Sequence, residues 1–161
     1  MPRIPNALPI DSPRCDPRLP EAALRYRRTS SPLLTTRDAL GAINVTAWLY
    51  RDRNGVEGIQ VNPNVTIAEL TRLFGPAASP NAEVGLHSEG RAAEWFRTRP
   101  HLQVLQIFTE RIPCREMCGP MLWHYYPGIP WYSYYDSNSW KGNRGELLKR
   151  AGDILKTVYG L

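Results

Sequence analysis

The chain contains a histidine and a glutamate two positions apart, His87 and Glu89, and two cysteines four positions apart, Cys114 and Cys118, with Pro113 directly before the first cysteine. One neutral imidazole and two thiolates supply three ligands for a tetrahedral Zn²⁺ and leave its fourth position open to water, as in catalytic zinc sites. A carboxylate beside such an ion is suited to moving protons. We therefore expect His87, Cys114 and Cys118 to bind zinc and Glu89 to be the catalytic residue.

One other histidine competes for the metal. His124 follows Cys118 by six residues, and as a fourth ligand it would close the site and leave a purely structural zinc ion. On that alternative Glu89 is only a residue at the start of a helix, and the chain is a non-catalytic, zinc-stapled nucleic-acid-binding module. We favour the catalytic interpretation because the four residues occur in the right order, after a proline and near two predicted helix starts.

The elements that must position these residues follow from hydrophobic periodicity and turn signals. Asn54-Gly55 is a strong hairpin signal between two segments that read as strands. Helices that alternate with strands after an opening hairpin predict an α/β fold, a three-layer sandwich with a central mixed sheet of about five strands flanked by helices. The expected strands are 42–50, 56–61, 102–109 and 129–135, and the expected helices are 21–28, 66–74, 87–99, a segment after Pro113, and 146–159.

The predicted elements also bring the metal ligands together. His87 falls at the start of one helix and Cys114 at the start of the next, with the strand 102–109 between them. Adjacent helix N-termini can converge on one point, and their positive ends stabilise thiolates. We expect Cys114 and Cys118 to lie on one face of the second helix, because they are at positions i and i+4.

Composition limits the classes of protein to which the chain can belong. Its 161 residues carry 20 Lys and Arg against 15 Asp and Glu, a net charge of +5, which favours a polyanionic partner. Three cysteines, with Cys15 left over from the metal set, argue against a disulfide framework. No apolar run reaches the roughly 18 residues of a membrane span. Residues 1–20 are rich in proline and predict a linker or domain edge, so a single domain is expected over 21–161.

Aromatic residues are concentrated in the last third of the chain. About half should pack in the core, because alternation along a strand puts Trp131, Ser133 and Tyr135 on one face and Tyr132 and Tyr134 on the other. Rings at the end of that strand can stack on nucleobases, a contact worth about 1–3 kcal/mol each. The residues expected to contact a substrate are Tyr135, Trp140, Tyr134, Asp136 and Trp131, with Asn44 and Asn62 as amides at the ends of the hairpin.

The pattern His-x-Glu…Pro-Cys-x-x-x-Cys resembles the zinc-dependent cytidine deaminase superfamily. Within it, the segment 85–93 resembles the His-x-Glu-Gly-x-x-Ala helix start of bacterial polymorphic-toxin deaminases that attack cytosine in DNA. The gap of 23 residues between Glu89 and Pro113 is similar to that of the APOBEC/AID deaminases. The segment 134–136 (Tyr-Tyr-Asp) is also similar to theirs. The likeness covers roughly residues 42–160. It departs in the cysteine spacer, which has three residues rather than the commoner two.

The resemblance implies both a fold and a reaction. The fold would be the cytidine deaminase sandwich, with zinc held by His87, Cys114 and Cys118. Glu89 would take a proton from the attacking water and deliver it to the substrate, so that cytosine becomes uracil. We expect single-stranded DNA as substrate, because the base must leave its stack and the chain is basic. Double-stranded DNA is the nearest alternative, ahead of RNA and the free nucleoside.

The resemblance also implies a biological setting. The chain would be the catalytic domain of a longer polypeptide, a secreted or delivered toxin that acts in the cytoplasm of a target cell. An immunity protein would be its inhibitory partner. We expect a monomer that binds DNA and does not bind a membrane.

Overall fold

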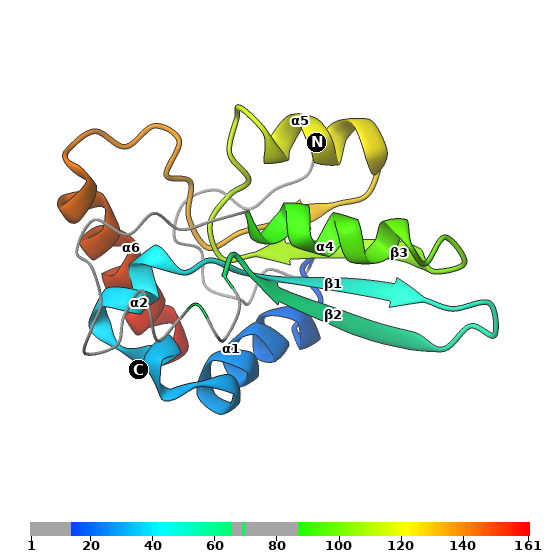
Figure 1. Cartoon of the computed structure of the whole chain (residues 1–161), viewed down its shortest axis with the longest axis horizontal. Coiled ribbons are helices and arrows are strands. Elements are labelled where there is room, and N and C mark those ends of the chain that lie inside the picture. Colours follow the sequence, from blue (N-terminus) through cyan, green and yellow to red (C-terminus); the bar gives the residue numbers. More distant parts are fainter. Residues whose placement is uncertain (1–13, 66–68, 70–86) are drawn as a thin grey trace.

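The computed structural model describes residues 14–65, 69 and 87–161. These residues confirm a mixed α/β fold built on a four-stranded mixed sheet (Figure 1). The strands are β1 (Val45–Arg51), β2 (Glu57–Pro63), β3 (Gln103–Thr109) and β4 (Trp131–Tyr132). The helices are α1 (Arg18–Ser30), α2 (Arg37–Ala42), α4 (Ser88–Arg97), α5 (Cys118–Tyr125) and α6 (Arg144–Tyr159), with a 3-10 helix η1 at Pro32–Thr35.

The strands lie in the order β2-β1-β3-β4. β1 pairs antiparallel with both β2 and β3, and β4 pairs parallel with β3. The predicted β1–β2 hairpin is confirmed: Gly55 adopts a φ of 79° in its turn, and Asp52 Oδ1 accepts the N–H groups of Asn54 and Val56 at 2.8 and 2.9 Å. Glycine suits this turn because it tolerates a positive φ without steric cost.

β4 is much shorter than the aromatic strand predicted from the sequence. Only Trp131 and Tyr132 pair with β3 before the chain bends at Tyr134, and a single parallel bridge then joins Tyr135 to Arg111. The bend breaks the expected alternation, since Tyr134 and Tyr135 both pack in the same apolar cluster. Among the described residues the sheet has four strands, where the sequence predicted about five.

Side chains of β1 alternate between two apolar clusters. Val45, Ala47 and Leu49 belong to a cluster shared with α1 and α6, whereas Trp48 belongs to a cluster shared with α4 and stacks on Phe96 with centroids 5.3 Å apart. Neighbouring residues of a strand point to opposite faces, so α1 and α4 cover opposite faces of the sheet (Figure 1). Burial of each such large apolar side chain stabilises the fold by about 1.5–3 kcal/mol.

α1 begins earlier than the sequence predicts. Its first residue is Arg18, and Cys15, expected in an extended segment, is buried in the cluster beneath α1. Asp16 fixes this start, because its carboxylate accepts the N–H of Arg18 at 3.0 Å and pairs with the guanidinium of Arg18. Its own N–H donates to Gln106 Oε1 on β3 at 2.6 Å.

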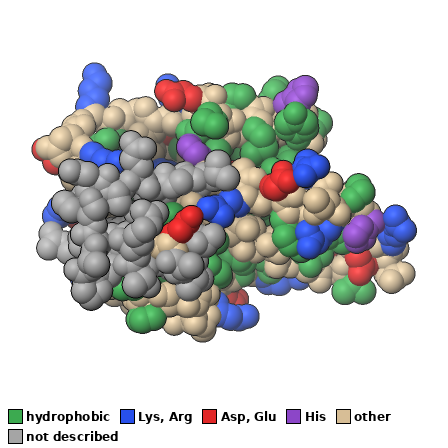
Figure 2. Space-filling model, in the orientation of Figure 1, with side chains coloured by type: hydrophobic (Ala, Val, Ile, Leu, Met, Phe, Trp, Pro, Cys, Tyr) green, Lys and Arg blue, Asp and Glu red, His purple; other side chains and the backbone are tan. Residues whose placement is uncertain are grey.

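Two predicted segments fall largely outside the described residues. The linker predicted at 1–20 is described only from residue 14, and of the helix predicted at 66–74 only Glu69 is described. Among the described residues no helix is long and apolar enough to cross a membrane. Large exposed apolar side chains gather at and just before α5, namely Met117, Trp123 and Tyr125 (Figure 2).

Candidate metal centre and its pocket

The three predicted ligands meet between the starts of two helices. His87 is the N-cap of α4, Cys114 lies in the loop after β3, and Cys118 is the first residue of α5. Their ligand atoms all lie within 4.8 Å of one another. The competing His124 is not in this cluster: it is exposed on α5 and its ring contacts Tyr125, with centroids 4.7 Å apart.

The helix that carries Cys118 begins later than predicted. A helix starting directly after Pro113, with both cysteines on one face, is wrong, because α5 starts only at Cys118. Pro120 gives the physical reason. In a helix starting at Cys114 it would fall in the second turn, where it removes a hydrogen bond and clashes with the preceding turn. In α5 it lies in the first turn, where N–H groups have no helical partner.

Cys114 therefore lies in a loop that folds back on the start of α5. The carbonyl of Cys114 accepts the N–H of Gly119 at 2.8 Å, and its Sγ accepts the N–H of Cys118 at 3.2 Å. A backbone donor at a helix N-terminus favours a thiolate, so this loop suits a metal-binding sulfur.

The distance between two of the ligand atoms fits a tetrahedral ion. Cys114 Sγ lies 3.6 Å from His87 Nδ1. On a tetrahedral ion with a metal–sulfur bond of about 2.3 Å and a metal–nitrogen bond of about 2.0 Å, two such ligand atoms stand roughly 3.5 Å apart. The His87, Cys114 and Cys118 cluster can therefore hold a metal ion.

The environment of the second cysteine favours a cation over a bare thiolate. Burial raises the pKa of the Cys118 thiol well above its usual range, and the negative charges of Glu89 and Cys114 raise that pKa further. The thiol thus keeps its proton at neutral pH unless a metal ion replaces it. Metal binding here should release protons and strengthen as the pH rises.

Glu89 is buried beside this cluster, with 3% of its surface exposed. Its Oε1 accepts hydrogen bonds from Thr109 Oγ1 at 2.8 Å and from Asn44 Nδ2 at 3.3 Å, and its Oε2 accepts from Ser88 Oγ at 3.2 Å. All three donors are neutral, and no described Lys or Arg forms an ion pair with Glu89. The carboxylate is oriented without being neutralised.

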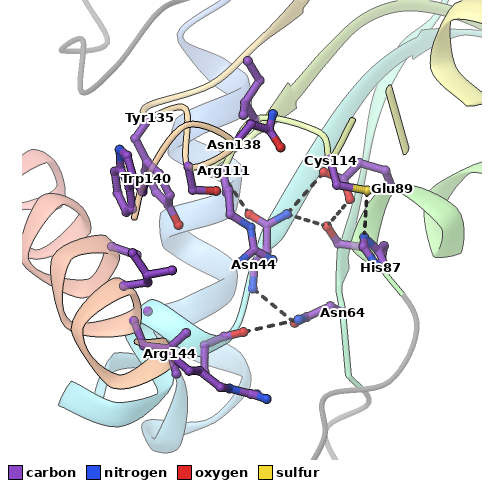
Figure 3. Close-up of a pocket in the computed structure, with 18 residues that line it drawn as sticks. Asn44, Asn64, His87, Glu89, Arg111, Cys114, Tyr135, Asn138, Trp140 and Arg144 are labelled. Atoms are coloured by element: carbon purple, nitrogen blue, oxygen red, sulfur yellow. Dashed lines mark hydrogen bonds between the residues drawn. The ribbon is translucent and has the colours of Figure 1, made fainter. Parts of the chain in front are cut away.

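Asn44 joins this carboxylate to the loop that carries Cys114 (Figure 3). Its Nδ2 donates to Ser88 Oγ and Thr109 Oγ1, both at 2.9 Å, and its Oδ1 accepts the N–H of Arg111 at 2.9 Å. The N–H of Asn44 donates to Asn64 Oδ1 at 3.1 Å. The sequence predicts Asn44 as a pocket amide, and it does line the pocket, but its side chain is committed to this network.

A cavity of about 500 Å³ opens at the metal centre. α2 and α6 close it on the side away from the metal ligands, with Leu147, Leu148 and Ala151 of α6 in its wall. The two sides of the pocket carry different chemistry, with His87, Glu89 and Cys114 on one and Tyr135, Trp140 and Arg144 on the other (Figure 3).

The predicted aromatic contacts divide into two groups. Tyr135 and Trp140 line the pocket and stack on each other, with centroids 5.2 Å apart and planes 14° apart. The guanidinium of Arg150 lies 4.1 Å from the centroid of Trp140, so both groups cover the indole ring. The pair therefore forms a rigid wall. Trp131 and Tyr134 are buried in the two apolar clusters and are not among the described lining residues.

Asp136 and Asn62 also lie outside the described pocket lining. Asp136 Oδ1 accepts the N–H of Asn138 at 2.9 Å, and Asn62 Oδ1 accepts from Gln60 on β2 at 3.1 Å. In each case the residue two positions further along, Asn138 or Asn64, lines the pocket instead. No sequence signal shows which member of each pair lines the pocket, because that depends on where the chain turns.

Several residues of the site are not identified by the sequence patterns. Ser88, Thr109 and Arg111 each lie within two residues of a motif residue or at the end of a predicted strand, which was the available signal. Arg144 carries no such signal, since it belongs to the terminal helix. Comparisons with protein-family models, curated proteins and solved structures give no match for this chain, so its function has to be argued from this site.

Proposed function

We propose that the chain is a zinc-dependent hydrolytic deaminase that converts cytosine to uracil in single-stranded DNA. The position of Glu89 carries the proposal: a buried carboxylate, held by neutral donors, lies at a pocket beside a His-Cys-Cys cluster. A zinc ion that only staples a fold needs neither the pocket nor the oriented carboxylate. The resemblance of the ligand pattern to the cytidine deaminases points to the same reaction.

The ligand set favours zinc over other divalent ions. One imidazole and two thiolates are soft to borderline ligands, and the distance between Cys114 Sγ and His87 Nδ1 suits tetrahedral coordination. When bound, Zn²⁺ supplies a Lewis acid that makes water a nucleophile at neutral pH. For their part, Cys114 and Cys118 must give up their protons, and His87 must present an unprotonated Nδ1.

Glu89 moves the protons of the reaction. Its carboxylate takes one proton from the attacking water and delivers it to the ring nitrogen next to carbon 4. It then takes the second proton from the hydroxyl formed at carbon 4 and delivers it to the departing amino group. Water enters, the bond from carbon 4 to the amino nitrogen breaks, and uracil and ammonia are the products. Asn44, Ser88 and Thr109 hold the carboxylate in position during these transfers.

Single-stranded DNA is proposed because an unpaired base reaches a pocket at the lowest unstacking cost. The net charge of +5 supports a polyanionic substrate. The proposal includes the three-layer sandwich of the superfamily, which the apolar clusters on opposite faces of the sheet support. It also includes the toxin setting and immunity partner that the resemblance implies.

The test compares the wild-type chain with Glu89→Ala on matched single-stranded DNA, double-stranded DNA, RNA and cytidine, with uracil measured by chromatography. We expect uracil from the single strand with wild type, and none with Glu89→Ala, while zinc content and folding persist. Glu94→Ala, which removes an exposed carboxylate from the same helix, is the matched control and should stay active.

Two outcomes would overturn the proposal. Uracil formation by Glu89→Ala would remove its central residue. A wild-type protein that binds one zinc ion and forms uracil from none of the four substrates would instead support the non-catalytic, zinc-stapled module.

A further inference from the structure

Two arginines line the pocket without an acidic partner among the described residues. Arg111 follows β3 and Arg144 is the first residue of α6, and neither forms an ion pair with a described residue. Six other arginines do form ion pairs in the described part of the chain. No described residue therefore neutralises the charge of either pocket guanidinium, and both can attract an anion.

A single acidic group on the described lining offsets only part of their charge. Glu89 is the one carboxylate among those lining residues, it is 3% exposed, and its oxygens accept bonds from Asn44, Ser88 and Thr109. The His-Cys-Cys cluster would be neutral with a divalent ion and two thiolates. The accessible charge of the pocket is thus positive, which attracts an anion.

The two guanidiniums occupy different parts of the pocket. Arg111 has its backbone fixed between the two sides, because its N–H donates to Asn44 Oδ1 and a parallel bridge joins it to Tyr135. Burial raises the pKa of Tyr135 to about 12, and the positive charge of Arg111 opposes this rise. Arg144 is exposed, on the side of the pocket opposite Glu89 (Figure 3).

The wall next to Arg144 is apolar and closed. Leu147, Leu148 and Ala151 of α6 line it together with Gly41 of α2. A side chain at Gly41 would collide with the backbone carbonyl of Leu148, so the two helices are in close contact there. A wall of this kind suits the face of a base or sugar. The cavity of about 500 Å³ extends along it, beyond the space that one pyrimidine ring at the metal needs.

We infer that Arg111 and Arg144 bind two backbone phosphates of one nucleic-acid strand, and that the α6 wall receives the nucleoside next to the target base. The inference rests on the proposed function and names the form of its substrate: a nucleotide inside a strand rather than a free nucleoside or mononucleotide. Guanidinium groups suit this role because their planar fork matches phosphate oxygens. A free nucleoside brings an anion to neither arginine.

The experiment measures binding rather than turnover. The zinc-loaded full chain carries Glu89→Ala, and fluorescence anisotropy gives the affinity for a labelled cytosine-containing single strand from about 50 to about 200 mM salt. Arg111→Gln and Arg144→Gln are compared with Arg53→Gln, which removes an exposed charge from the β1–β2 turn. Circular dichroism and zinc content verify that each variant is folded.

Each pocket variant should weaken binding roughly tenfold and reduce the slope of log affinity against log salt by about 0.7, the value for one lost phosphate contact on a single strand. Arg53→Gln should leave the slope unchanged. Slopes that remain unchanged in both pocket variants would overturn the inference, whether or not wild type forms uracil.

Competition separates a strand from a mononucleotide. Unlabelled single strand should displace the probe at far lower concentration than deoxycytidine monophosphate or cytidine. If the monophosphate competes as well as the strand, the pocket takes a single nucleotide and the inference is wrong. If the slopes fall as expected but wild type forms no uracil, the proposed function fails while the phosphate sites stand.

Discussion

Two buried carboxylates of this fold are held in opposite ways. Glu110 lies directly after β3 and is fully buried. Its carboxylate accepts hydrogen bonds from Arg27 Nε at 2.9 Å and Arg27 Nη2 at 2.8 Å. It also accepts the Tyr159 hydroxyl at 2.7 Å and the Val45 N–H at 2.8 Å. Glu89 is almost as buried, but its donors among the described residues are all neutral and it lines a cavity.

The difference in their partners indicates which of the two buried acids is suited to react. The charge of Glu110 is balanced by a guanidinium that also donates to the carbonyls of Leu34 and Ile43, so this pair ties α1 to β1 and to the segments around α2. Glu89 has a fixed orientation and no ion pair with a described Lys or Arg, so it is suited to act beside a metal ion. One carboxylate links elements, and the other is suited to chemistry.

The largest expected effect comes from removing the charge of each acid. Glu110→Gln should destabilise the fold by about 3–5 kcal/mol, because it leaves Arg27 buried and unpaired. Glu89→Gln should change stability by less than about 1 kcal/mol while uracil formation falls roughly 10²–10⁴-fold. Urea denaturation and uracil assays measure both. Equal losses of stability in the two variants would remove the distinction.

A smaller effect is expected at the residue that orients Glu89. Asn44→Ala should cost about 1–3 kcal/mol, because it leaves the Arg111 N–H without its acceptor. It should also lower kcat roughly tenfold or more with little change in KM, since the carboxylate loses an orienting donor. Asn62→Ala, outside the described pocket lining, is the control. A fall in stability with unchanged kcat would make Asn44 purely structural.

The hydrogen bonding of Glu110 can also be weakened while its ion pair with Arg27 is kept. Tyr159→Phe removes one donor to Glu110 and leaves Arg27 in place, so a loss of about 1.5 kcal/mol is expected. Thermal denaturation compares it with Tyr125→Phe, an exposed position that should be neutral. Uracil formation should be the same in both variants, and a specific loss in Tyr159→Phe would connect the two networks.

The smallest effect is a change in how the free energy of unfolding depends on pH under alkaline conditions. Burial raises the pKa values of Tyr134 and Tyr159 above their usual range. An unfolded tyrosine ionises near pH 10, so the stability from these groups is complete below about pH 10 and is lost as the pH rises above it. Above about pH 10 the free energy of unfolding therefore falls as the pH rises. Removing one such group by Tyr159→Phe should reduce the slope of this fall by at most about 1.4 kcal/mol per pH unit. An unchanged slope would contradict this.

Local patterns predicted the parts of the molecule that depend on neighbours in the chain. Asn54-Gly55 indicated the hairpin because the turn itself needs a positive φ. Pro120 is a signal of the same local kind for the start of α5, because a proline limits a helix through local geometry. The length of β4 was not predictable in this way, since it depends on how the chain after Tyr132 packs on distant segments.

The sequence by itself predicted the His87, Cys114 and Cys118 cluster that can hold a metal ion, and an acid next to it, because ligand chemistry depends on residue type and short spacing. Only the tertiary structure decided what each side chain does in its surroundings. It paired Glu110 with Arg27 across 83 positions, joined Asn44 to Glu89 across 45, and brought Arg144 of the terminal helix to the pocket. Burial and charge balance arise from contacts between distant segments, and these contacts separate a structural carboxylate from one free to react.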